Sequence, residues 1–110
     1  MAEAIDGAWL AKRGHFHDGE VVEIRRAGSD LEVVIGAEWV NERGLSMPDG
    51  EPAPIVLVFR GASVQGNADA AAGGEISSLN SPDDGHYRIV LVDRDPVTIM
   101  AGAAFCRRTV

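Results

Sequence analysis

The chain has 110 residues with 17 acidic and 10 basic side chains, giving a formal net charge of −7 at pH 7. This length predicts a single domain over residues 1–110, large enough to bury a core, and the one cysteine, Cys106, excludes a disulfide within the chain. An acidic surface repels phosphate backbones, and no apolar run approaches the ~20 residues that cross a membrane, so neither nucleic acid nor membrane is an expected partner.

Residues 3–12 are predicted to form a short N-terminal helix. Ile5, Ala8 and Trp9 recur at helical spacing, and Gly14 ends the pattern. We expect Ile5 and Trp9 to cover one end of a sheet.

From Phe16 onward, apolar and polar residues alternate, as they do along β-strands. Residues 21–25 and 31–35 show this alternation, and the turn between them, residues 27–30, contains a glycine. Two alternating segments joined by such a turn predict a β-hairpin.

The later strands follow the same reasoning. Residues 55–59 contain no polar side chain, which predicts a strand buried on both faces, and residues 86–92 and 97–107 are predicted as two further strands. Five or six short strands and one helix predict an all-β, mainly antiparallel fold. We expect a small β-sandwich or a curled half-barrel with the N-terminal helix as a lid.

Two features of this predicted sheet could bind a protein partner. Trp39 lies at the border between a strand and a polar loop, where it either closes the core or anchors an interface. Several glutamates alternate with core residues and indicate a solvated acidic sheet face: Glu20, Glu23, Glu32 and Glu38. Such a face could cover a basic site on a partner, with charge mainly accelerating the encounter.

His15 and His17 are candidate metal ligands. Residues two apart on a strand point the same way, so the two imidazoles could chelate one divalent ion if a third ligand approaches in space. That ligand would be His86 or a carboxylate such as Glu20 or Asp84. The competing interpretation is that His17 and Asp18 hydrogen-bond the start of the strand while His15 is exposed.

No motif for catalysis accompanies these residues. Cys106 follows an apolar residue and is interpreted as a small buried side chain, and no glycine-rich loop joins a strand to a helix. We therefore expect no enzymatic activity and no cofactor.

Three short stretches of the chain resemble a known family. They are the stretches Phe16-His17-Asp18-x-Glu20-Val21, Val58-Phe59-Arg60-Gly61 and Phe105-Cys106-Arg107-Arg108-x-Val110. They are similar to the immunity protein 50 family of bacterial polymorphic toxin systems. The resemblance implies a cytosolic protein of short strands that binds and neutralises a toxin domain, and it identifies no binding residues.

The sequence leaves three hypotheses open. The first is a non-catalytic binding protein of the bacterial cytoplasm, such as an immunity protein with a basic toxin domain as its partner. The second is a metal- or ligand-binding β-domain centred on His15 and His17. The third is a structural module that forms a homodimer. The bacterial origin rests on composition, because nine of the ten basic residues are arginine, and the cytoplasmic expectation rests on an acidic N-terminus without signal-peptide character.

Overall fold

The structure is a computed structural model, and it describes residues 3–12, 14–16, 19–36 and 55–108. Within these residues, the strands and helices in chain order are β1 (Glu3–Ala4), α1 (Gly7–Lys12), the 3-10 turn η1 (Gly14–Phe16), β2 (Val21–Ala27), β3 (Asp30–Ile35), β4 (Ile55–Arg60), β5 (Ser63–Gln65), α3 (Ala68–Ala71), β6 (Ile76–Asp83), β7 (His86–Leu91), β8 (Val97–Met100) and β9 (Ala103–Arg108).

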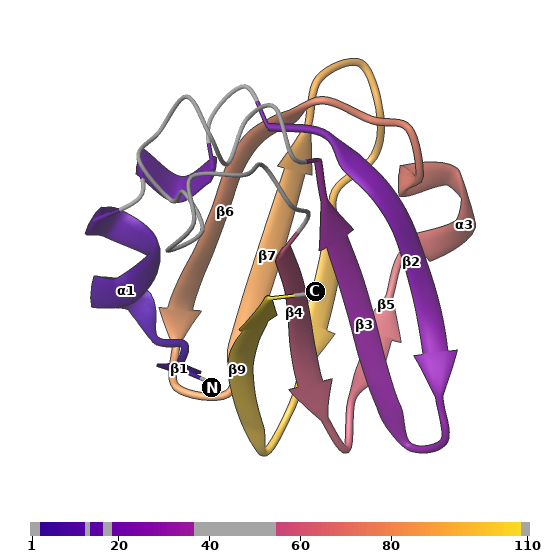
Figure 1. Cartoon of the computed structure of the whole chain (residues 1–110). Coiled ribbons are helices and arrows are strands. Elements are labelled where there is room, and N and C mark those ends of the chain that lie inside the picture. Colours follow the sequence, from indigo (N-terminus) through magenta and orange to yellow (C-terminus); the bar gives the residue numbers. More distant parts are fainter. Residues whose placement is uncertain (1–2, 13, 17–18, 37–54, 109–110) are drawn as a thin grey trace.

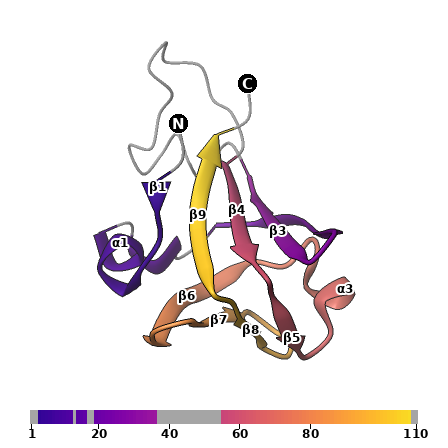
Figure 2. The same ribbon diagram turned by 90° about the horizontal axis from the view of Figure 1, so that it is seen from below.

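The described strands form two antiparallel sheets that face each other. The five-stranded sheet has the order β1-β9-β4-β3-β2, and the four-stranded sheet has the order β5-β8-β7-β6. Figures 1 and 2 show the two layers, with α1 beside β1 and β6 and with α3 at the opposite side. The predicted fold class, a mainly antiparallel all-β sandwich, is confirmed.

The core lies between the two sheets and follows the strand alternation. Leu31, Val33 and Ile35 of β3 point into it and meet buried residues of the four-stranded sheet, and the rings of Phe59 and Tyr87 pack at 5.0 Å between centroids. The expectation that residues 55–59 are buried on both faces is confirmed, since every one of them is buried.

The N-terminal helix is shorter than residues 3–12. Glu3 and Ala4 instead pair with β9, and the amide of Ile5 donates to the carbonyl of Ala104 at 2.9 Å. The helix begins only after Asp6, whose Oδ1 accepts from the amide of Trp9 at 2.8 Å and so caps the N-terminus. Trp9 packs against the core beside Phe16, at 5.8 Å between ring centroids, as a cover for the edge of the sheet.

The two sheets are continuous at one corner, because two neighbouring strands bend there together. β4 continues into β5 around Gly61, and β8 continues into β9 around Gly102 (Figure 1). The amide of Gly102 donates to the carbonyl of Arg60 at 3.0 Å, which keeps the β4–β5 segment paired with the β8–β9 segment through the bend. Gly61 has φ of +61°, a left-handed conformation that glycine adopts without strain. This bend explains why the predicted strand 97–107 is divided in two.

A second connection, which we call the seam, joins residues 19–21 to residues 73–76. The Val21 amide donates to the Gly74 carbonyl at 2.9 Å, the Gly73 amide donates to the Val21 carbonyl at 2.6 Å, and the Ile76 amide donates to the Gly19 carbonyl at 2.7 Å. The start of β2 is thus paired on both sides, because Val21 also pairs with Ile35 of β3. The seam ties the edge of the five-stranded sheet to the start of β6.

The seam makes Gly74 a sensitive position. A Cβ at Gly74 would lie 2.9 Å from the carbonyl oxygen of Ala71 and 3.3 Å from the Arg94 side chain. We expect Gly74→Ala to lower the free energy of unfolding by about 1–3 kcal/mol in urea titrations, because the extra methyl group forces backbone atoms apart. Gly102→Ala is the control, since nothing lies within 4 Å of its Cβ position, and it should stay within about 0.5 kcal/mol of the native chain. Equal stability of the two variants would contradict this account of the seam.

Candidate functional site

Glu32 is a buried charge on the outer face of the five-stranded sheet. Its side chain is 11% exposed, and it accepts hydrogen bonds from two arginines on other strands. Arg25 on β2 donates through Nε at 2.6 Å, and Arg107 on β9 donates through Nη2 at 3.1 Å. Because Arg107 pairs with Val56 of β4, its side chain must cross β4 to reach Glu32. The three side chains form what we call the Glu32 triad.

The triad holds Glu32 in its ionised form. The hydrogen bond from Arg25 lowers the pKa of Glu32, and the positive charge of Arg107 lowers it further, whereas burial acts in the opposite direction. The negative charge of Glu32 is therefore balanced within the protein and is not available to attract a partner.

Apolar side chains lie on the same outer face as the triad. Val34, Val56 and Val58 form a buried cluster there, and the half-buried ring of Phe105 packs against it. This second cluster lies on the opposite side of β3 and β4 from the main core. It is the reason that β4 has no polar residue among positions 55–59.

The predicted acidic residues do not form one surface in the described part of the chain. Glu23 shares the outer face with Glu32 and contacts Arg25 at 3.4 Å, so this face carries arginines as well as acids. Glu20 lies elsewhere, at the seam. Glu38 and Trp39 lie outside the described residues, and their role as partner-binding residues stays a prediction.

The seam places Glu20 directly opposite Glu75. The backbone hydrogen bonds on either side join the sequence neighbours of the two glutamates, not the glutamates to each other. In an antiparallel pair, this is the arrangement in which opposed side chains come closest. Both side chains are exposed. Neither carboxylate has an ion pair or a side-chain hydrogen bond with any other described residue. Two unpaired like charges directly opposite each other destabilise a sheet.

Exposed valines flank this glutamate pair on both sides. Val22, the extra residue of a bulge in β2, is 49% exposed, and Val92 is 42% exposed. A Cβ at Gly36 would lie 3.6 Å from Cγ2 of Val22 and 3.8 Å from Cβ of Glu20. The side chains of Val22 and Glu20 therefore lie side by side, next to Gly36. The amide of Val92 donates to the carbonyl of Glu75 at 3.0 Å, which places Val92 beside Glu75. We call the row Val22, Glu20, Glu75 and Val92 the seam surface.

Sequence reasoning found one of the four residues of the seam surface, Glu20. Glu75 and Val92 were missed because the pairing that brings them to Glu20 is long-range and leaves no local pattern. Val22 was missed because it is an apolar residue within the alternating segment 21–25, where nothing in the sequence marks a bulge. The bulge between Val21 and Glu23 turns it outward.

The histidine pair is only partly within the described residues. His15 lies in η1 rather than on a strand, is half-buried and has φ of +54°, while His17 lies outside the described residues. The proposed chelate therefore stays a prediction. Among the described residues, no three His, Cys, Asp or Glu side chains converge as metal ligands.

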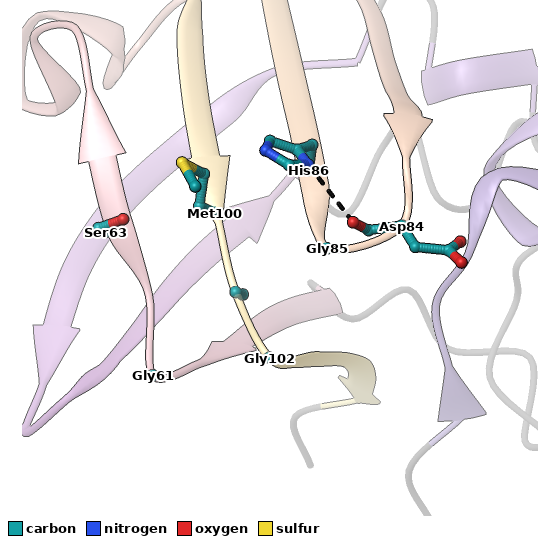
Figure 3. Close-up of a pocket in the computed structure, with 8 residues that line it drawn as sticks. Gly61, Ser63, Asp84, Gly85, His86, Met100 and Gly102 are labelled. Atoms are coloured by element: carbon teal, nitrogen blue, oxygen red, sulfur yellow. Dashed lines mark hydrogen bonds between the residues drawn. The ribbon is translucent and has the colours of Figure 1, made fainter.

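An open pocket of about 360 Å³ lies beside the corner at which β5 and β7 begin and β8 ends. Ser63, His86 and Met100 line it from three neighbouring strands, and Gly61, Gly85 and Gly102 form its rim (Figure 3). Sequence reasoning named His86 only as a third ligand for His15 and His17. It did not place His86 beside Met100.

No family model, curated protein or solved structure matches the chain. The similarity to the immunity protein 50 family accordingly stays a prediction. Among the described residues, none of the helices has the length and apolar character required to span a bilayer.

The Glu32 triad predicts a specific pH dependence. The pKa of Glu32 is lowered by folding, so the triad stabilises the protein above the ordinary glutamate pKa of about 4.3, and this contribution is lost as the pH falls through the lowered value. We expect Glu32→Gln to lower the free energy of unfolding by about 1–2 kcal/mol at neutral pH, a modest loss because both arginines are about half exposed. In urea titrations across pH, the difference from the native chain should shrink in acid.

Glu23→Gln is the matched control for this measurement, because Glu23 shares Arg25 but is 52% exposed. Its effect should stay below about 0.5 kcal/mol. A native chain no more stable than Glu32→Gln at neutral pH would show that the triad does not contribute to stability.

Proposed function

We propose that the protein is a non-catalytic binding protein whose seam surface covers a basic site on a protein partner, in the manner of an immunity protein that neutralises a toxin domain. The observation that carries the proposal is the unpaired Glu20–Glu75 pair between two exposed valines. The resemblance to the immunity protein 50 family supports the same function.

Electrostatics favours a cationic partner at this surface. The two carboxylates repel each other in the free protein, and a lysine or arginine placed between them relieves that repulsion. The net charge of −7 also attracts a basic protein from a distance and so accelerates the encounter. An arginine is the better fit of the two, because its planar guanidinium can donate to both carboxylates at once.

The valines add an apolar contribution to binding. Both are about half exposed, so a partner that covers them removes enough apolar surface to contribute about 1 kcal/mol for each side chain. A charged centre with apolar contacts on both sides also requires a partner of matching shape. The preferred partner is therefore a folded basic surface that carries apolar residues beside a cation.

Charge reversal at the seam tests the proposal. The double variant Glu20→Lys/Glu75→Lys, immobilised and exposed to an extract of the cells that encode the protein, should capture its basic partner at least about tenfold less well than the native chain, because like charges then face each other. The variant should keep the fold, since it replaces one exposed like-charge pair with another. The bound protein is quantified by mass spectrometry over a range of salt concentrations.

The control is Asp83→Lys/Asp84→Lys, which makes the same change in net charge at the exposed β6–β7 turn. It should capture the partner nearly as well as the native chain. Equal capture by the seam variant, or the absence of any stoichiometric partner of the native chain, would count against the proposal.

A further inference from the structure

His86 and Met100 lie directly opposite each other on β7 and β8. The amide of Ala101 donates to the carbonyl of Gly85 at 2.9 Å, so this hydrogen bond joins the residue before His86 to the residue after Met100. This is again the antiparallel arrangement with the shortest separation between opposed side chains. An imidazole and a thioether therefore share one small area of the outer face of the four-stranded sheet.

The imidazole of His86 is oriented by the backbone. Its Nδ1 lies 3.3 Å from the carbonyl oxygen of Asp84, and since a carbonyl only accepts, Nδ1 carries the proton in this bond. In the neutral ring with this tautomer, the other nitrogen, Nε2, carries the lone pair, and Figure 3 shows it on the side of the ring that faces β8. A histidine that binds a metal through one nitrogen commonly donates from the other to such a carbonyl.

Met100 supplies a soft donor from the neighbouring strand. Met100 is 41% exposed, so its thioether is accessible from solvent. In Figure 3 the sulfur lies on the side of β5, towards Ser63, so the site requires a change of rotamer that turns the flexible Met100 side chain towards His86. The open rim at Gly61 and Gly102, where nothing lies within 4 Å of either Cβ position, leaves room for this rotation and for an external third ligand.

The ligand types select the ion. A thioether is a soft ligand that prefers Cu(I) to hard divalent ions, and imidazole also binds copper. The nearest carboxylate in the pocket, that of Asp84, points away from His86 and Met100 in Figure 3, so no oxygen anion adds affinity for a harder cation there.

We propose that His86 Nε2 and Met100 Sδ form a binding site for a soft monovalent cation of the Cu(I) type. The site is independent of the seam surface and of the histidine pair His15 and His17. It requires no movement of the backbone, because both ligands stand on paired strands.

Silver nitrate is the probe, because Ag(I) has the ligand preference of Cu(I) without its redox chemistry. The titration uses chloride-free buffer and a Cys106→Ala chain, so that the one thiol does not compete. We expect one Ag(I) per chain in calorimetry, with NMR shifts at the Met100 ε-methyl group and at His86 Nε2. The ε-methyl groups of Met1 and Met47 should not move.

His86→Gln and Met100→Leu should each weaken Ag(I) binding by at least about tenfold. Loss of a residue that only hydrogen-bonds to a metal ligand already lowers affinity by about this much, so loss of a ligand itself should lower it at least as far. His15→Gln is the control and should leave the affinity unchanged, and circular dichroism confirms that each variant keeps its fold. Binding that survives both substitutions, the absence of 1:1 binding, or equally tight binding of Zn²⁺ would each overturn the proposal.

Discussion

The arrangement of this protein depends on the three backbone hydrogen bonds of the seam. Without them, the start of β2 would be an open sheet edge with unpaired amide and carbonyl groups. With them, residues 19–21 and residues 73–76, more than 50 positions apart, are held in fixed register. That register places Glu20 opposite Glu75 and sets the two valines beside them. The chemistry of the seam surface is thus a consequence of backbone pairing, not of side-chain attraction.

The carboxylates of the chain are used in two different ways. Glu32 is buried against Arg25 and Arg107, and these hydrogen bonds offset the free energy of removing its charge from water. Glu20 and Glu75 are exposed and have no cation among the described residues. A carboxylate that is already paired with arginines inside the protein contributes little to the binding of a cationic partner. An unpaired pair of carboxylates is stabilised when a cation binds between them. This contrast, and not the number of acids, is why we propose the seam surface as the partner-binding site in preference to the outer face of the five-stranded sheet.

Local patterns in the sequence predicted the parts of the fold that local forces determine. The apolar segment 55–59 gave the correct burial. The alternation in residues 31–35 correctly placed Leu31, Val33 and Ile35 in the core, but it put Glu32 on a solvated face, whereas the arginines of β2 and β9 bury it. The short strand β1 was missed, since two residues carry no periodicity and only the distant β9 makes them a strand. The same limit applies to the sites: Arg107 reaches Glu32 from 75 positions away, and His86 meets Met100 only through the register of β7 and β8.

The chemical character of Val22 links the fold to the proposed interaction. As the extra residue of a bulge, Val22 has no directly opposed partner on β3, and its side chain contributes little to the core. A polar residue would satisfy the same backbone geometry and would suit an exposed position better. Packing among the described residues therefore stabilises Val22 little, although β-branched residues are common in strands. In the proposed interaction a partner would cover this apolar side chain, and the same holds for Val92 on the other side of the glutamate pair.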